Sequence, residues 1–483
     1  MRRLRVVGLS LAFLSLAMLV VSAQAGTAKP QSGKVNETAR VSVWDAVTTR
    51  TQLQSARVSQ KAVGVSLPPG LAMSAAGYGS PKVSCPSVSG CLSTWGTANL
   101  LVLGEHRGKW SREATLAGVG LLALACPAIG SCVGTGWISG QPGVVTQSGR
   151  NWRASSVQFP PSAPGGLFVS VSCGSVGDCT AVGSGQIFKQ YDIESHALAV
   201  SEKAGIWGEA LDEQLPPDMA TSPDPERDVG STGGGASVIS CASAGNCAMG
   251  GSYTAKVVEP HGPAYRSEGW VATKHAGVWR PATRVQLPAG ADTGYSSFGI
   301  RGMSCPSARN CTAVGHYGGE GLILTERHGV WLRGTKAPQP SAARSRSLSC
   351  ADPNDCADVT YNGWLVTERH GKWNASKLVL PRKTKAPGGV SLNQVSCPSR
   401  GNCVAIGFYL SHGKTNGLID IERRGKWQRA IRASLPKNAA KATRQHGGLD
   451  SISCPSTNHC TTVGTYTDRA GKTQGLIVNL LIG

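Results

Sequence analysis

The sixteen cysteines are the side chains of this 483-residue chain with the clearest capacity for chemistry. Facing residues of an antiparallel hairpin lie within disulfide reach, so two cysteines flanking one turn can be joined. Zinc sites favour shorter C-x2–4-C spacings with a second pair or histidines, and the C-x-x-C of redox and haem proteins is absent. We therefore predict local disulfides, no metal site and no cofactor. The cysteines form eight pairs, all spaced C-x5-C: Cys85 with Cys91, Cys126 with Cys132, Cys173 with Cys179, Cys241 with Cys247, Cys305 with Cys311, Cys350 with Cys356, Cys397 with Cys403, and Cys454 with Cys460.

A second group of side chains could perform acid–base chemistry. Glu194 and His196 lie in one insertion of the repeated sequence and Glu259 and His261 in the next, so the four could converge. Carboxylates about 5–10 Å apart cleave glycosidic bonds, but sequence alone does not establish that separation. The chain also contains no nucleophile elbow, P-loop or H-E-x-x-H motif. These four residues are therefore either catalytic or simply the polar residues of solvent-exposed loops.

Basic side chains gather in three successive loops. The chain has 48 Lys and Arg against 28 Asp and Glu, a net charge of +20. Clustered cations attract polyanions, so we predict that these loops bind an extracellular anionic polymer, a glycan or a protein. No recognition helix or aromatic-rich motif accompanies them, which disfavours nucleic acid. The predicted binding residues are Arg344 and Arg346, then Arg382, Lys383 and Lys385, and finally Lys437, Lys441 and Arg444.

The elements that position these groups follow from the spacing of the cysteine pairs. First cysteines are 41, 47, 68, 64, 45, 47 and 57 residues apart, a period typical of a repeat array. Each unit has four short apolar stretches separated by turn residues, which predicts a four-stranded meander. The sequence therefore predicts an all-β fold, a β-propeller of about eight four-stranded blades, seven being the other count considered.

The last unit stops after its third strand, at Gly483. Residues 59–68 match the Ala and Leu-Pro spacing of the outer strands at 207–216 and 279–288, with Ser59 in place of Trp. We predict that this N-terminal strand completes the last blade and closes the ring, which removes an exposed sheet edge. Chance similarity in an Ala-rich chain is the alternative.

The repeated sequences S-C-P-S-x3-C-x-A-V-G and T-E-R-x-G-x-W resemble those of secreted bacterial β-propeller repeat proteins, most of them uncharacterised. They are represented here by Ser304–Gly315 and by the segment that ends at Trp373. Some units depart from the pattern, with Gly174 and Ala242 in place of proline. The resemblance implies the fold and secretion, and it carries over no catalytic residue.

The N-terminus independently predicts export. Arg2, Arg3 and Arg5 precede the apolar run 9–21, and Ala23-Gln24-Ala25 has the form that signal peptidase cleaves. No later stretch reaches the roughly 18 apolar residues of a membrane span. We expect a signal peptide at 1–25, a polar leader or linker at 26–58 and a propeller at 59–483, forming a secreted monomer.

The topology of a meander separates two faces. The cysteine turns and the short H-G or R-G turns fall on one face, and the long insertions fall on the other. Variable loops on a rigid frame often carry function, so we expect the site on the insertion face and the adjoining channel mouth. The predicted function is a disulfide-stapled binding scaffold, with an extracellular carbohydrate-active hydrolase or lyase as the alternative.

Overall fold

The computed structural model describes residues 43–52, 57–67, 80–189, 192–220, 232–259, 262–291, 297–382, 384, 386, 389–440 and 447–483. Within these residues every regular element is a β-strand and there is no helix, which confirms the all-β prediction. The described part of the chain holds no helix long and apolar enough to span a membrane.

The strands form repeating units, numbered here in chain order, each built on one cysteine pair. Unit one contains β3 (Lys82–Ser87), β4 (Gly90–Trp95), β5 (Asn99–His106) and β6 (Lys109–Ala117). Unit two contains β7 (Val119–Ala128), β8 (Ser131–Ile138), β9 (Gln141–Ser148) and β10 (Asn151–Ser156). Unit three contains β11 (Gly166–Ser175), β12 (Asp178–Lys189), β13 (Asp192–Lys203), β14 (Ile206–Trp207) and β15 (Leu211–Asp212). Unit four contains β16 (Thr232–Ser243), β17 (Asn246–Glu259), β18 (Gly262–His275), β19 (Val278–Trp279) and β20 (Thr283–Arg284).

The second half of the chain repeats this plan. Unit five contains β21 (Phe298–Ser307), β22 (Asn310–Tyr317), β23 (Glu320–Arg327), β24 (Val330–Trp331) and β25 (Thr335–Lys336). Unit six contains β26 (Ser345–Asp352), β27 (Asp355–Thr360), β28 (Trp364–Arg369) and β29 (Lys372–Lys377). Unit seven contains β30 (Val390–Ser399), β31 (Asn402–Ser411), β32 (Lys414–Arg423), β33 (Lys426–Trp427) and β34 (Ile431–Arg432). Unit eight contains β35 (Gly448–Ser456), β36 (His459–Thr467) and β37 (Thr473–Ile482).

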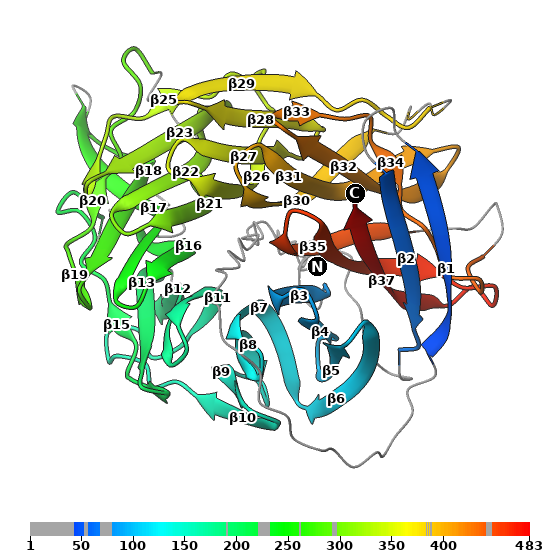
Figure 1. Ribbon diagram of the computed structural model, residues 1–483. Coiled ribbons are helices and arrows are strands. Elements are labelled where there is room, and N and C mark those ends of the chain that lie inside the picture. The colour runs from blue at the N-terminus through cyan, green and yellow to red at the C-terminus, as the bar shows by residue number, and fades with distance from the viewer. Residues whose placement is uncertain are drawn as a thin grey trace, which may run out of the picture.

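Strand order within each unit follows the chain, and the pairing within a unit is antiparallel. Figure 1 shows the units arranged around a central axis, with β3, β7, β11, β16, β21, β26, β30 and β35 innermost. Consecutive inner strands contact each other, including β35 of unit eight with β3 of unit one. Units three and four are also linked by a short parallel pairing of β13 with β16.

An N-terminal strand lies in the sheet of unit eight. β2 (Arg57–Val65) pairs with β37 in antiparallel register, with Ser59 opposite Leu481 and Val65 opposite Gly475. This is the pairing predicted for residues 59–68. β1 (Val43–Gln52) pairs with β2 in turn, so the sheet has five strands and continues into the stretch expected to be a leader.

All sixteen cysteines are paired as predicted, in eight disulfides, and none is free. Each bond joins the end of an inner strand to the start of the second strand, with Cα atoms 3.9–4.1 Å apart. A loop this short gives about 2 kcal/mol per bond in the chain-entropy view. The disulfides therefore fasten the same turn in every unit. In chain order they join Cys85 to Cys91, Cys126 to Cys132, Cys173 to Cys179, Cys241 to Cys247, Cys305 to Cys311, Cys350 to Cys356, Cys397 to Cys403, and Cys454 to Cys460.

A serine hydroxyl links each such turn to the next unit in seven of the eight cases. The backbone N–H of Cys350 donates to Ser304 Oγ at 3.0 Å, and Cys397 donates to Ser349 Oγ at 3.0 Å. The same bond runs from Cys85 of unit one to Ser453 of unit eight, also at 3.0 Å. In unit two the position is occupied by Ala125, so Cys173 lacks this bond. The remaining members are Ser84 with Cys126, Ser172 with Cys241, Ser240 with Cys305 and Ser396 with Cys454.

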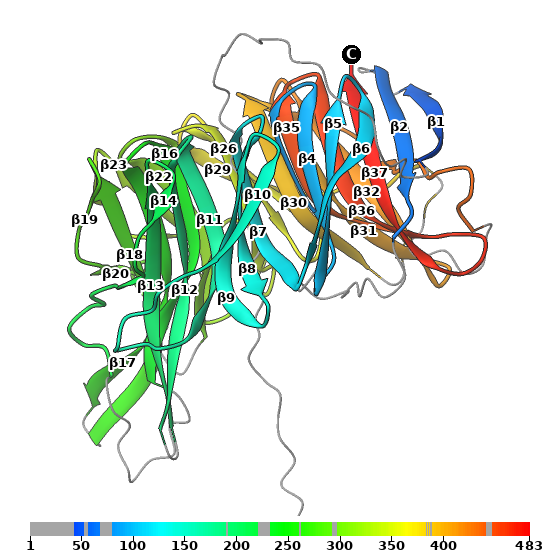
Figure 2. The same ribbon diagram turned by 90° about the horizontal axis from the view of Figure 1, so that it is seen from below.

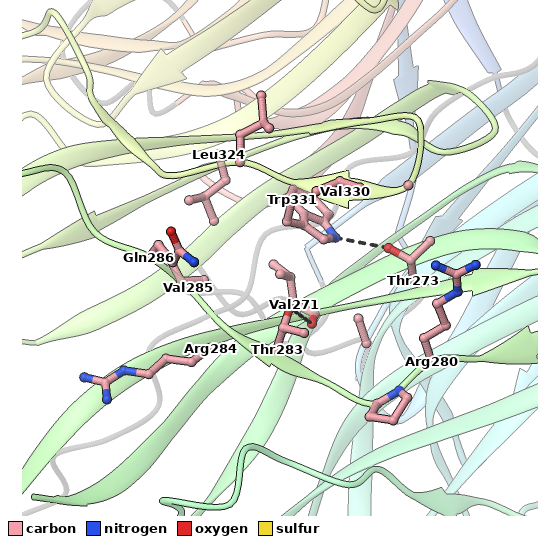
Figure 3. A pocket seen from close by; sticks show the side chains of 14 residues that line it. Val271, Thr273, Arg280, Thr283, Arg284, Val285, Gln286, Leu324, Val330 and Trp331 are labelled. Atoms are coloured by element: carbon pink, nitrogen blue, oxygen red, sulfur yellow. Dashed lines mark hydrogen bonds between the residues drawn. The ribbon is translucent and has the colours of Figure 1, made fainter.

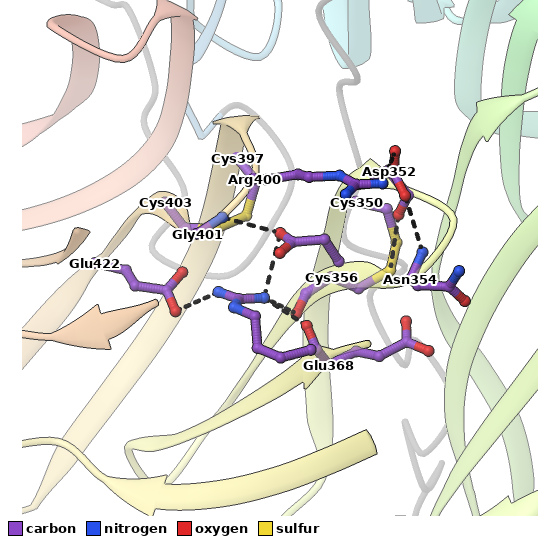
Figure 4. Close-up of polar contacts among 12 residues, drawn as sticks. Cys350, Asp352, Asn354, Cys356, Glu368, Cys397, Arg400, Gly401, Cys403 and Glu422 are labelled. Carbon is purple, nitrogen blue, oxygen red and sulfur yellow. Dashed lines mark hydrogen bonds and ion pairs between the residues drawn. A yellow bond between two sulfur atoms is a disulfide. The ribbon is translucent and has the colours of Figure 1, made fainter. Parts of the chain in front are cut away.

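The repeated T-E-R sequence forms a second link between units on the same side. Arg369 of unit six contacts the Glu422 carboxylate of unit seven, and its Nη1 lies 3.3 Å from Asp355 Oδ1. Figure 4 shows Glu368 and Glu422 close to the disulfide-bonded turns of units six and seven. One unit earlier, Arg327 Nη2 lies 3.9 Å from Glu368 Oε1. Burial raises the pKa of Glu368 to about 7 and also raises that of Glu422. These recurring glutamates are therefore structural groups.

The outermost strand of a unit contacts the preceding unit through its Trp and through the residue three positions later, which explains their constant spacing in the repeat. In four units the outer strand is broken, and the residue three positions after Trp donates its N–H to the preceding unit. Ala430 donates to Val379 O at 2.9 Å, and Ala282 donates to Gln214 O at 3.3 Å. The tryptophans pack against the preceding unit as well, since Trp331 Nε1 donates to Thr273 Oγ1 at 3.1 Å beside a pocket of about 300 Å³ (Figure 3).

Candidate anion-binding site on the insertion face

The long hairpins lie together on the face opposite the disulfides. β12 and β13 have 12 residues each and β17 and β18 have 14, against six residues for β27 and for β28. Figure 2 shows the β17 hairpin projecting beyond the rest of the sheets. The inner strands begin at this face, so their first residues lie near the central axis.

Four cations from three units converge at or just before these strand beginnings. Two of them, Arg344 and Arg346, were predicted, and the other two, Arg301 and Lys82, were not. Arg301 is electrostatically coupled to Arg344 and to Tyr361. Arg346 Cζ lies 4.0 Å from the centroid of the Tyr361 ring, a cation–π contact. We call Arg301, Arg344, Arg346 and Lys82, with Tyr361 and Asp450, the axial cluster.

A repeated backbone irregularity aims three of these side chains. In each inner strand from unit two to unit eight, the register shifts at the residue four positions before the first cysteine. A β-bulge of this kind redirects the extra side chain. The extra residue is Arg301 in unit five, Arg346 in unit six and Asp450 in unit eight. Asp450 of unit eight interacts electrostatically with Lys82 of unit one and with Arg346 of unit six. Because unit seven lies between units six and eight, Asp450 and Arg346 can interact only if both side chains face the axis.

The same position is uncharged in the other units. Ser237 Oγ donates to Ile300 O of the next inner strand at 2.9 Å, and Asn393 Nδ2 donates to Leu449 O at 2.6 Å. Leu122 and Val169 occupy it in units two and three. One side of the axis is therefore charged and polar, and the other is apolar.

The electrostatics of the cluster favour an anion. Burial lowers the pKa of Lys82 to about 8, against the opposing effect of Asp450. Burial raises the pKa of Asp450 to about 6, opposed by Lys82 and Arg346. Burial, Arg301 and Arg344 lower the pKa of the neighbouring His316 to about 4, so this imidazole is neutral at pH 7. A second acid, Asp358, accepts a hydrogen bond from Ser345 Oγ at 2.7 Å, and burial raises its pKa to about 8, so it is neutral at pH 7. Asp450 is thus the acid whose negative charge opposes three arginines and a lysine.

The remaining predicted cations are not brought into this cluster by any described contact. Arg382 is exposed in the connection from β29 to β30, and Lys437 is exposed after β34. The Lys437 carbonyl accepts a hydrogen bond from Arg469 Nη2 at 2.8 Å. Lys383, Lys385, Lys441 and Arg444 lie outside the described residues. Sequence reasoning missed Arg301 and Lys82 because they belong to inner strands rather than to loops, although the bulge position could have been read from the cysteine spacing.

Two of the predicted catalytic candidates line a separate pocket of about 540 Å³ between units three and four. His196 Nδ1 lies 2.8 Å from Asp212 Oδ2, and His196 Nε2 lies 3.8 Å from Glu194 Oε1. Glu213 lines the same pocket, and burial followed by the charge of Asp212 raises its pKa to about 7. Asp212 and Glu213 were not predicted, because only the folded outer strand β15 places them beside β13.

The other two candidates give no such site. Glu259 is the last residue of β17, opposite Gly262, and its side chain lies outside the described part of the structure, as does His261. In the described ranges, no group of three or more His, Cys, Asp or Glu side chains is arranged to hold a metal ion.

The chain matches no known protein-family profile and no curated protein. Among solved structures it is similar to YCF48 bound to D1 peptide, with 12% identity, a TM-score of 0.39 and 75% of this chain and 91% of that chain covered. It is similar to U3-55K at 8% identity and a TM-score of 0.41, covering 74% and 94%. The WD40 repeats of RRP9 match at 7% identity and a TM-score of 0.43, covering 75% and 94%.

Repeated four-stranded antiparallel meanders, packed through their inner strands around one axis, define the class of protein. The chain is a disulfide-containing β-propeller repeat protein.

Proposed function

We propose that the protein is a secreted scaffold that binds an extracellular anionic polymer or glycan through the insertion face. In this proposal eight blades form a closed ring, β2 completes the last blade and residues 1–25 are removed on export. Eight intrachain disulfides support an oxidising compartment, because such bonds persist mainly outside the cytosol.

The observation that carries the binding function is the convergence of Arg344 and Arg346 with Arg301 and Lys82, where Asp450 supplies the opposing negative charge. Arg301, Arg346 and Lys82 belong to inner strands, so they lose little conformational freedom when a ligand binds, and their attraction for an anion is retained. The exposed Arg382 and Lys437 extend this proposed surface outward. Lys383, Lys385, Lys441 and Arg444 add positive charge to the same two stretches of sequence, which increases the rate of encounter with an anion.

Binding of the purified protein to isolated anionic cell-wall polymer tests this function. We expect binding at low salt that weakens about tenfold or more at roughly 0.3 M salt. The double variant R344Q/R346Q should weaken binding by a further factor of about ten. Its control is R112Q/R153Q, which removes two exposed arginines from outer strands β6 and β10. Equal affinity of the two double variants, or no polymer binding, would exclude the proposed function.

Export has its own test. Protein recovered from the culture medium should begin at Gly26 when its N-terminus is sequenced, since cleavage is expected after Ala25. An N-terminus at Met1 would contradict secretion through a signal peptide.

A second function, an extracellular carbohydrate-active hydrolase or lyase, is favoured by the pocket between units three and four. Asp212 orients the His196 imidazole, which can accept a proton from water. Glu213, whose pKa is about 7, can donate a proton to a leaving oxygen. Glu194 Oε1 lies 3.8 Å from His196 Nε2 and can stabilise positive charge on that imidazole.

This second function requires turnover. A panel of glycans should be cleaved by the wild type and not by E213Q or H196Q, whereas E209Q, on the exposed outer edge, should retain activity. Absence of any cleavage by the wild type would leave binding as the function of the scaffold.

A further inference from the structure

Arg301 differs from the other cations of the axial cluster. Arg346 and Lys82 are both coupled to Asp450, and Lys82 Nζ also donates to Ser80 O at 2.9 Å. Among the described residues, no carboxylate is coupled to Arg301. Its guanidinium is partly buried, and burial lowers its pKa. Removing a guanidinium from water without a counter-charge is costly, so an external anion would relieve this cost.

Arg344 interacts electrostatically with Arg301 and adds a second positive charge that no described carboxylate is seen to neutralise. Each of these two guanidiniums carries a positive charge, and Arg344 opposes the charged form of Arg301. Arg301 Nε and the His316 ring both lie within 3.5 Å of the point that a Cβ on Gly299 would occupy, and among the described residues the buried His316 Nδ1 has no hydrogen-bond partner. Burial and the two guanidiniums lower the pKa of His316 to about 4, so the imidazole is neutral at pH 7. The two arginines therefore share one unsatisfied region of positive potential.

The neighbouring aromatic ring completes the surroundings. Tyr361 is 42% exposed, and one of its faces carries Arg346. It lies in the tight turn between β27 and β28, where Gly363 has a φ of 76°. The Tyr361 N–H donates to Arg344 O at 3.3 Å, which holds this turn beside the residue that precedes β26. Such a ring offers an amphipathic edge to the carbon skeleton of a ligand.

We propose, on the basis of the proposed function, that Arg301 and Arg344 form a subsite for the phosphate groups of a phosphate-bearing polymer, with Tyr361 at its edge. A carboxylate presents one planar pair of oxygens, which a single guanidinium satisfies. A phosphate presents oxygens in several directions and can accept from two guanidiniums at once. The subsite therefore favours phosphate polymers over carboxylate polymers of equal charge.

The test compares long-chain inorganic polyphosphate with polygalacturonate, titrated calorimetrically into the full-length mature protein. Wild type should bind polyphosphate more tightly, and inorganic phosphate should compete at high concentration. R301Q should weaken polyphosphate binding about ten- to hundredfold, as expected for lost charge-assisted hydrogen bonds. It should weaken polygalacturonate binding by less than about threefold, because one arginine fork remains. R112Q, which removes an exposed arginine from β6, serves as the control for net charge.

R301K separates charge from geometry and also serves if R301Q does not fold. It keeps the positive charge but loses the planar fork, so polyphosphate affinity should still fall by about fivefold or more. If R301Q and R301K weaken both polymers no more than R112Q does, the phosphate subsite is wrong, while salt-sensitive polymer binding by the wild type leaves the proposed function standing. If the wild type binds neither polymer, both the subsite and the proposed function are overturned.

Discussion

The cysteine face presents the same disulfide-bonded turn in every unit, whereas the insertion face carries connections that differ from one unit to the next. On the cysteine face, serine hydroxyls and buried Arg–Glu pairs join neighbouring units at the same repeat positions. On the insertion face, the same repeat position holds Arg301, Arg346 or Asp450 in some units and Leu122 or Val169 in others.

The two faces differ because a repeat protein can vary at some positions and not at others. Contacts that join units must be reproduced at every junction, because one weak junction interrupts the packing around the axis. A ligand site has to be built only once, so the position that forms it is free to differ between units. Side chains on the cysteine face should therefore affect stability, and those on the insertion face should affect binding.

The largest expected effect is from Arg369→Ala, on the cysteine side. It leaves the buried carboxylates of Glu422 and Asp355 without their cation, and breaking such a group costs about 3–5 kcal/mol. Urea unfolding should measure this loss. Lys372→Ala, an exposed change in the same unit, is the control and should cost less than about 0.5 kcal/mol. Equal effects would show that the pair does not join the units.

The buried glutamates predict a pH dependence. The pKa of Glu368 rises from its ordinary value of 4.5 to about 7, mainly through burial. The folded state therefore holds this proton more tightly than the unfolded state, and the resulting stability is present below about pH 4.5 and lost as the pH rises through about 7. We expect stability to fall by about 2–3 kcal/mol between pH 5 and 8 from this group.

Calorimetry of Glu368→Gln checks this dependence. The variant should show a flatter profile of Tm against pH than the wild type, because glutamine does not titrate. Glu209→Gln, on the exposed outer edge, should keep the wild-type profile. A wild type whose Tm increases from pH 5 to 8 would contradict the sign.

A smaller effect is expected from the serine link. Ser396→Ala removes the acceptor of the Cys454 N–H, at 3.2 Å, and should cost about 1–2 kcal/mol. Ala125→Ser introduces a hydroxyl at the one junction that lacks it, next to Cys173, and should increase stability by about 0.5–1 kcal/mol. Denaturant titration of both variants measures the two changes, and destabilisation by Ala125→Ser would show that this junction packs differently.

The smallest effect on stability is expected on the insertion face. Arg382→Gln changes an exposed side chain in the connection from β29 to β30 and should alter stability by less than about 0.5 kcal/mol. It should instead slow association with anionic polymer, more so at low salt. Stopped-flow measurement of the association rate at two salt concentrations tests this. A loss of stability without a change in that rate would contradict a binding role for the insertion face.

The disulfides and the strand plan could be predicted because they depend on local spacing. Seven residues from cysteine to cysteine are enough to define a hairpin turn, and the same segment occurs eight times. The pairing of β2 with β37 was also predictable, because the Ala and Leu-Pro positions of residues 59–68 follow the outer-strand pattern. These features require only neighbouring residues or a copy of the same pattern.

The candidate site was predicted only in part. Arg344 and Arg346 were chosen for their charge in a loop, but Arg301 and Lys82 lie in β21 and at the start of β3, where sequence suggests ordinary strand residues. The Asp212–His196 pair was missed for a similar reason, since the broken outer strand of unit three brings Asp212 beside β13.

The sequence by itself determined the all-β repeat, its disulfides and the pairing of β2 with β37, because each is encoded by a local pattern that recurs. Only the tertiary structure decided which side chains meet at the axis and which buried charges join the units. Arg346 and Asp450 are 104 residues apart and belong to units separated by a third, so their proximity follows from the packing of inner strands around one centre. No periodicity along the chain contains that information.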